Sequence, residues 1–335
     1  MSEIRKKQHI DLAFSTRPSG RIDLGDLFYE PIFSAHPVDG QSLSLDFLGH
    51  RLQTPLWVSS MTGGTQKASL INKNLALACG EFGFGMGLGS CRSLLDGENS
   101  PKRFADFDVK KYMGKSPLFS NFGIAQLEQL VTKGSLEQAF EIGHKLQADG
   151  MIIHVNPLQE WAQEEGDRFT KPPLETIKAV LAMSQVPIIV KEVGQGFGPQ
   201  SLDALCRLPL AAIEFAGFGG TNFTNIEQAR RSGHISGKNT AVNSFGGIGH
   251  SVEEMLGFLS QLDSKDMKCK NFILSGGITD PLVGYKYLKS CPYPAVIGMA
   301  SEFLKHAMGE YKELKEFIDG VNDQLSMADS FLRRF

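Results

Sequence analysis

The sequence lacks most features that mark secreted, membrane-spanning or nucleic-acid-binding proteins. Its five cysteines are odd in number, widely scattered and never spaced as Cys-x-x-Cys, a poor pattern for a disulfide framework or a zinc site. No segment approaches the ~20 consecutive apolar residues that a membrane-spanning helix needs. The formal net charge of −3 argues against a broad nucleic-acid-binding surface. We therefore expect a soluble, cytoplasmic protein that binds neither nucleic acid nor membrane.

Short apolar runs recur along the chain, and each is followed by a turn and a segment with helical spacing. Uninterrupted runs of this length are typical of strands buried on both faces, as in a parallel sheet. Eight such runs are present, at residues 55–60, 84–89, 117–121, 151–155, 187–191, 211–215, 271–275 and 295–299. They match a (β/α)8 TIM barrel, which has eight strand–helix units in about 250 residues. A doubly wound sheet is the alternative, because this pattern does not reveal strand order.

The chain outside the repeat divides into an extension and a tail. Residues 1–50 precede the first run and predict an N-terminal extension, whereas residues 51–335 form the barrel and its C-terminal helix within one domain. Residues 222–250 are rich in Gly, Ser and Asn and predict a long loop or short additional elements. From Leu304 to Leu325, apolar residues recur at three- and four-residue spacing. That pattern predicts an amphipathic helix, packed on the barrel or on another subunit.

Polar and glycine-rich turns follow the predicted strands. In TIM barrels the active site lies at this end of the strands, in the loops that follow them. Three consecutive turns are rich in glycine, at residues 217–221, 275–278 and 298–301. Backbone N–H groups in such turns bind phosphate, although glycine also occurs in barrel turns for steric reasons alone. We predict a phosphate site there.

The densest group of functional side chains is His-Val-Asn-Pro-Leu-Gln-Glu at residues 154–160. Alternation along the strand end directs His154 and Asn156 to one side. Glu160 is a candidate magnesium ligand, since Mg²⁺ is usually held by one or two carboxylates and substrate phosphates. The alternative is an ordinary capped loop in which Gln159 and Glu160 are solvated.

Two basic features also have two interpretations each. Lys191 ends an apolar run, and a buried lysine is costly without a partner. It could pair with Glu192 or Glu214, or lie beside an electron-rich ring and stabilise an anion. The basic residues between Arg5 and His9 are either a solvated arm or a flap that closes over a diphosphate.

These motifs, in this order, resemble those of the type 2 isopentenyl-diphosphate isomerases. The matching segments are RKKQHI (5–10), MTGG (61–64), GLGSCR (87–92), NFG (121–123), HVNPLQE (154–160), VKEVG (190–194), GGTNF (219–223) and SGGI (275–278). The resemblance implies FMN, Mg²⁺, NADPH as the reductant, and a homotetramer or homo-octamer. It also implies the isomerisation of isopentenyl diphosphate to dimethylallyl diphosphate. This is an allylic proton shift in which reduced flavin acts as acid and base, with no net redox change.

The resemblance also implies roles for individual residues. The residues expected to contact FMN are Met61, Thr62, Gly63, Ser90, Asn121, Lys191, Thr221, Gly277, Ala300 and Ser301. Those expected to line the substrate site are Arg5, Lys6, His9, Ser90, Arg92, His154, Asn156 and Gln159. The expected catalytic group is Gln159, Lys191, His154 and Asn156, and Glu160 is the expected Mg²⁺ ligand.

Several positions depart from the family pattern. Thr279 stands where an arginine is usual, which weakens phosphate binding unless backbone N–H groups suffice. Glutamate at 214 and alanine at 216 replace aspartate and serine, and Gln8, Cys91, Asn222 and Phe223 are further departures. The main alternative function is a flavin-dependent oxidase or dehydrogenase of a 2-hydroxy acid. That chemistry needs a histidine base and an arginine clamp near the later strands, where this chain has Thr279 and Asp280.

Overall fold

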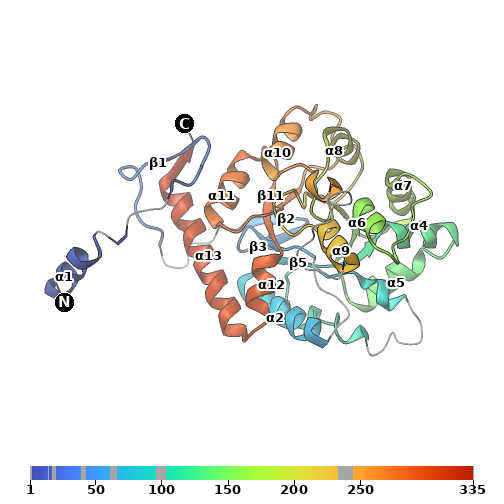
Figure 1. The fold of residues 1–335 in the computed structure, drawn as a ribbon, viewed down its shortest axis with the longest axis horizontal. Coiled ribbons are helices and arrows are strands. Elements are labelled where there is room, and N and C mark those ends of the chain that lie inside the picture. The colour runs from blue at the N-terminus through green and yellow to red at the C-terminus, as the bar shows by residue number, and fades with distance from the viewer. Residues whose placement is uncertain are drawn as a thin grey trace.

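The computed structural model describes residues 2–13, 15–16, 20–38, 43–60, 66–95, 103–232 and 244–334. Its centre is a closed barrel of eight parallel strands surrounded by helices (Figure 1). The strands are β4 (Leu56–Val58), β5 (Gly85–Gly87), β6 (Leu118–Gly123), β7 (Gly150–His154), β8 (Ile188–Lys191), β9 (Ala212–Glu214), β10 (Phe272–Ser275) and β11 (Ala295–Met299). Around the barrel they follow chain order, and β11 pairs with β4 to close it. The predicted TIM barrel is confirmed, and the doubly wound sheet is excluded.

The helices that follow the strands begin at residues suited to a helix N-terminus. Proline occupies the first turn of four of them, where its missing N–H costs nothing, and Ser251 and Glu254 form a capping box on a fifth. The helices are α2 (Gln66–Phe82), α4 (Ile124–Thr132), α5 (Glu137–Lys145), α6 (Pro157–Ala162), α7 (Pro173–Met183), α8 (Pro199–Cys206), α9 (Phe223–Ser232), α10 (Val252–Ser260), α11 (Pro281–Ser290), α12 (Ser301–Ala307) and α13 (Tyr311–Phe331). Short 3-10 turns are η1 (Cys91–Leu94), η2 (Lys110–Tyr112) and η3 (Ser244–Gly247).

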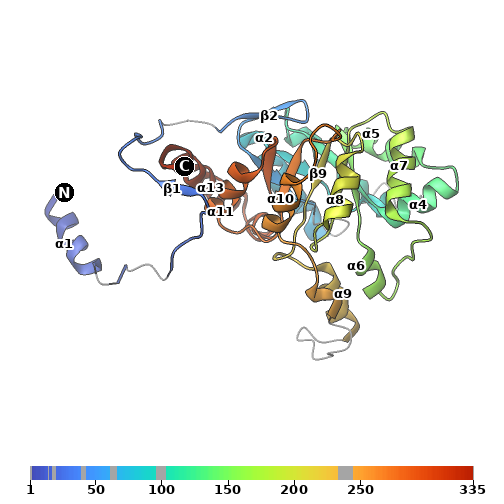
Figure 2. The same cartoon turned by 90° about the horizontal axis from the view of Figure 1, so that it is seen from above.

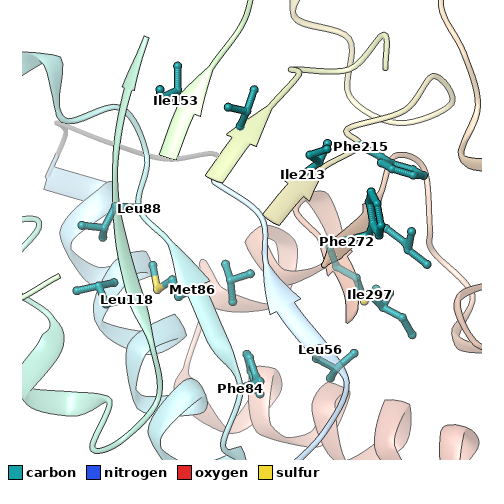
Figure 3. Packing of buried hydrophobic residues seen from close by; sticks show 14 of the residues in the cluster. Leu56, Phe84, Met86, Leu88, Leu118, Ile153, Ile213, Phe215, Phe272 and Ile297 are labelled. Atoms are coloured by element: carbon teal, nitrogen blue, oxygen red, sulfur yellow. The ribbon is translucent and has the colours of Figure 1, made fainter. Parts of the chain in front are cut away.

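Two apolar layers hold the barrel together, because alternate residues of each strand point to opposite sides. One layer lies between the strands and the helices, and Figure 3 shows examples of it such as Met86, Leu118 and Ile297. The other, which we call the inner layer, fills the lower half of the barrel. Its members on the strands are Trp57, Phe119, Ile152, Ile189, Ala212, Ile273 and Val296. The interior below the strand ends is therefore packed with side chains and is no channel.

A hairpin closes the amino end of the barrel. It consists of β2 (Leu45–Phe47) and β3 (His50–Leu52), and Phe47 packs edge-on against Trp57 with ring centroids 6.2 Å apart. Phe47 and Leu52 are both buried with the inner layer. Since this end is sealed by apolar side chains, a ligand enters from the carboxyl end of the strands.

Part of the N-terminal extension pairs with the C-terminal strand beside the barrel. In the extension, β1 (Leu27–Tyr29) pairs antiparallel with β12 (Leu332–Arg334), which directly follows α13. The single helix predicted from Leu304 to Leu325 is divided, because α12 ends at Ala307 and α13 begins at Tyr311. Within α13 the apolar spacing holds: Leu314, Ile318 and Leu325 are buried, and the helix packs on α2, α11 and α12. By contrast, α1 (Ser2–Leu12) lies apart from the barrel in both views (Figures 1 and 2). Across the described ranges, no helix combines the length and apolar character needed to cross a membrane.

Candidate active site

A ring of polar residues lies directly above the inner layer, at the carboxyl ends of the strands. Each member stands two residues after an inner-layer position on its strand, so it also points into the barrel. We call this the polar ring; its side chains are Ser59, Asn121, His154, Lys191, Glu214 and Ser275. Glycines at 87 and 298 take the two remaining places. Strand register pairs His154 with Lys191 and Lys191 with Glu214, so these three ionisable residues are neighbours.

His154 is held as a neutral ring. Its Nδ1 lies 2.9 Å from Asn121 Oδ1, and the Asn121 amide nitrogen donates to the Leu88 carbonyl at 3.0 Å. With the amide oriented in this way, Nδ1 carries the proton and Nε2 is an acceptor. Burial, and to a smaller extent the positive charge of Lys191, together lower the pKa of His154 to about 3. His154 can therefore orient a ligand by hydrogen bonding but contributes no positive charge.

We expect the His154 ring to remain neutral at every pH above about 4. Its pKa is below the unfolded-state value of 6.5, so the unfolded chain binds the additional proton between these two values. The contribution of His154 to stability therefore decreases as the pH falls through that window and is constant above it. NMR titration of the ring, assigned by comparison with His154→Asn, measures this pKa directly. A midpoint near 6.5 would contradict the neutral-ring assignment.

Lys191 is buried and oriented by the loop that follows it. Its ammonium donates to the Glu192 backbone carbonyl at 2.8 Å. The Glu192 carboxylate turns back on its own loop and accepts N–H bonds from Val193, Gly194 and Gln195 at 2.6–2.7 Å. Burial raises the pKa of Glu192, and these backbone bonds oppose the shift. The loop thus fixes a cationic side chain at the barrel mouth.

The segment from His154 to Glu160 forms one hydrogen-bonded unit. Pro157 starts α6, and the Asn156 amide donates to both Gln159 Oε1 and Glu160 Oε1 at 3.1 Å. Glu160 Oε2 accepts the Asp167 backbone N–H at 2.8 Å. Glu160 is only 5% exposed, so the interpretation of a solvated glutamate is wrong for this residue. Each of its oxygens retains a lone pair, and one carboxylate with substrate phosphates is a usual Mg²⁺ environment.

Asp167 belongs to this site but was not predicted from the sequence. Its carboxylate lies 3.1 Å from Arg92 Nη1 and accepts a hydrogen bond from Gln126 at 3.0 Å. Since its backbone N–H also binds Glu160, Asp167 connects the expected diphosphate-binding arginine to the expected metal ligand. No apolar spacing or motif singles out this loop residue. Its position seven residues after Glu160 was the only available signal.

The glycine turns and the polar ring together line a pocket suited to a nucleotide cofactor. Lys191, Thr221, Gly277, Ala300 and Ser301, all expected to contact FMN, line it. The turns pack backbone against backbone: a Cβ on Gly277 would lie 2.6 Å from the Gly219 carbonyl. Gly277 also has φ +70°, which disfavours a side chain. Backbone N–H groups can therefore approach a phosphate closely here. Such contacts suit a site in which Thr279 replaces the arginine that is usual in the family.

The remaining sequence-predicted residues have different placements. Ser90 caps η1 by accepting the Arg92 N–H at 3.4 Å, and both residues lie at the mouth. Arg5, Lys6 and His9 are exposed on α1, and the structure does not bring them to the barrel. Their substrate role, like the other assigned roles, stays a prediction. Met61, Thr62 and Gly63 lie outside the described residues.

Comparison with known proteins identifies the family, although no protein-family model matches the chain. The isopentenyl-diphosphate delta-isomerase of Rickettsia felis is 32% identical over 327 residues, covering 97% of this chain and 91% of the relative. That of Rickettsia prowazekii is also 32% identical, covering 97% and 92%. The chain belongs to the isopentenyl-diphosphate delta-isomerase family. This confirms the family and the isomerase class predicted from the motifs.

Solved structures share the fold of this isomerase-family chain at low identity. A mandelate oxidase variant with (S)-mandelic acid has a TM-score of 0.53 at 12% identity, covering 92% of this chain and 82% of that one. A flavocytochrome b2 variant with pyruvate has a TM-score of 0.55 at 14% identity, covering 91% and 72%. At such identities the likeness shows the barrel alone. The turn after β10 carries Thr279 and Asp280, and Asp280 caps α11 by accepting the Leu282 N–H.

Proposed function

We propose that this protein isomerises isopentenyl diphosphate to dimethylallyl diphosphate, with FMN and Mg²⁺ bound and NADPH as the reductant. The observation that carries the proposal is the Asn156–Gln159–Glu160 hydrogen-bonded unit at the barrel mouth. It occurs in a chain that matches isopentenyl-diphosphate delta-isomerases over nearly its whole length. The unit offers amide groups to an uncharged carbon chain and a carboxylate to a metal-bound diphosphate.

The residues of the pocket fit FMN. Lys191, Thr221, Gly277 and the turn at 300–301 line it, and Asn121 and Ser90 lie on neighbouring strand ends. Met61, Thr62 and Gly63 are expected to complete the contacts. When reduced, the flavin supplies the proton donor and acceptor that an alkene, a very weak base, requires. Lys191 places a fixed positive charge at the barrel mouth, where it would stabilise negative charge on the ring.

The substrate is expected to lie between the pocket and the Asp167 loop. Arg92 and a magnesium ion on Glu160 would bind the diphosphate, with Arg5, Lys6 and His9 closing over it. Neutral His154, Asn156 and Gln159 would orient the five-carbon chain without adding charge near a carbocation-like centre. Such positioning accelerates the reaction by restricting the substrate to a reactive geometry. We further propose a cytoplasmic homotetramer or homo-octamer.

An anaerobic assay of the purified protein tests this function. The protein is incubated with FMN, NADPH, Mg²⁺ and isopentenyl diphosphate, and dimethylallyl diphosphate is measured. We expect product only when the flavin is reduced, with no stoichiometric loss of NADPH. A yellow, reducible protein that forms no product would contradict the isomerase and retain the flavin site. Oxidation of a 2-hydroxy acid with reduction of the flavin would establish the alternative function.

A further inference from the structure

Glu214 is a buried carboxylate that the site described so far does not use. It ends β9, is 0% exposed, and lines the same pocket as Lys191 and Gly277. Its Oε1 accepts a hydrogen bond from Ser275 Oγ at 3.2 Å, whereas its Oε2 has no hydrogen-bond partner among the residues that the structure describes. Leaving a buried carboxylate oxygen without a hydrogen-bond donor destabilises the folded protein, and the cost exceeds that of an unpaired neutral acceptor. Such an atom in a pocket wall points to a ligand that supplies the donor.

Glu214 lies at one end of a row of strand-end positions, which continues through Ser275 and Gly298 to Ser59. We call this row the polar arc. Ser275 ends β10, Gly298 is on β11 and Ser59 follows β4, and these strands are consecutive around the barrel from β9. The Ser275 hydroxyl accepts the Ala216 N–H at 2.9 Å while it donates to Glu214, so its orientation is fixed. A Cβ on Gly298 would lie 2.7 Å from both Ser275 Cβ and Ser59 Oγ. Glycine therefore keeps the arc free of a side chain at its centre.

The hydroxyls of Ser59 and Ser60 are also without a partner within the described ranges. Both Oγ atoms are buried, form no hydrogen bond to any described residue, and line the pocket with Glu214. A carboxylate accepts hydrogen bonds only, whereas a serine hydroxyl both donates and accepts. A ligand with several hydroxyl groups satisfies all three residues, because each of its hydroxyls can donate to one and accept from another. A phosphate would be repelled by Glu214 and suits the glycine turn at 276–278.

We infer that Glu214, Ser59 and Ser60 form a binding subsite for the polyhydroxyl (ribityl) chain of a flavin nucleotide. This assignment rests on the proposed flavin-dependent function. The arc receives the hydroxyl groups, and the phosphate lies at the glycine turns between β10 and β11. Glu214 would thereby set the direction in which the cofactor lies across the barrel mouth, because the opposite orientation of the cofactor would place its phosphate against the Glu214 carboxylate.

Flavin binding to the apoprotein tests the subsite without measuring turnover. Three probes are titrated and followed by quenching of flavin fluorescence: FMN, riboflavin, which lacks the phosphate, and lumiflavin, which also lacks the ribityl chain. In Glu214→Ala we expect the affinity for FMN and riboflavin to fall about 10- to 100-fold, as for a lost hydrogen bond to a charged group. The affinity for lumiflavin should change less than about twofold. Ser59→Ala should show the same selectivity with a smaller loss.

Two additional variants separate the subsite from a structural role. Glu214→Gln keeps the size and the acceptor for Ser275 but removes the charge, and it carries the test if the alanine variant fails to fold. Glu128→Gln is the matched control, because Glu128 is a buried carboxylate on α4 that accepts the Thr170 N–H outside this pocket. We expect it to leave all three flavin affinities unchanged.

The outcomes distinguish this inference from the function on which it rests. Loss of FMN and riboflavin binding with retained lumiflavin binding supports the subsite. Equal losses for all three probes would overturn the subsite and leave a flavin protein. A wild-type protein that binds no flavin would overturn both proposals. The melting temperature of the Glu214→Gln apoprotein should stay equal or rise, because an unpaired buried charge is removed; a clear fall would indicate a structural role.

Discussion

Replacing Lys191 with alanine is expected to reduce isomerisation by about 10²–10³-fold, as when a preorganised electrostatic contact is removed from an active site. The ammonium is buried and held in place by the Glu192 carbonyl at 2.8 Å, so no rearrangement is needed for it to act on a ligand at the mouth. Turnover of isopentenyl diphosphate is measured with saturating FMN and Mg²⁺ under anaerobic, reducing conditions. The absorbance spectrum of the reduced flavin should show less of the anionic form.

The control for this substitution is a second buried lysine away from the site. Lys286, on α11, is 7% exposed and forms ion pairs with Asp23 and Glu253 at 3.3 and 3.4 Å. Lys286→Ala should retain turnover, since it alters the helical exterior of the barrel. Near-normal turnover in Lys191→Ala, with flavin bound, would contradict a catalytic role for Lys191 and indicate that it serves only in packing.

The barrel was predictable because its signal is repeated along the chain. Eight uninterrupted apolar runs reflect burial on both faces of each strand, a requirement of the fold itself. Strand-end residues such as His154 and Lys191 could be placed at the mouth for the same reason. The polar ring was harder to predict, because a three-residue strand such as β9 provides too little alternation to show that Glu214 points inward. Its position became clear only from the register with Lys191.

Loop geometry accounts for most of what the sequence left open. Asp167 joins Arg92 to Glu160, and Glu192 binds the N–H groups of its own loop. Both depend on the path of an irregular backbone, and no periodic pattern encodes that path. The N-terminal motif shows the opposite problem. Its match with the family predicts a substrate contact, yet α1 exposes Ile4 and Ile10 and has no described partner surface that would position it over the mouth.

Replacing Glu160 with glutamine is expected to raise the Mg²⁺ concentration for half-maximal turnover by on the order of 100-fold, the upper range for residues that support a metal site. The substitution removes the negative charge that would face the metal. It also presents an amide to two donors, the Asn156 side chain and the Asp167 N–H, so one of these loses its acceptor. The Mg²⁺ dependence of isomerisation at fixed substrate concentration measures the effect.

The matched control is a glutamate in the loop that follows α6, outside the hydrogen-bonded unit. Glu165 pairs with Arg230 at 2.7 Å and is exposed, so Glu165→Gln removes the same charge from this part of the chain but touches neither Asn156 nor Asp167. If Glu160 is the ligand, only its substitution shifts the Mg²⁺ titration, and excess Mg²⁺ restores part of the rate. If both variants shift it equally, the loop acts through its overall charge. If Glu160→Gln lowers the maximal rate at an unchanged Mg²⁺ requirement, its role is to hold Asn156 and Gln159 in place, and the metal must be bound elsewhere.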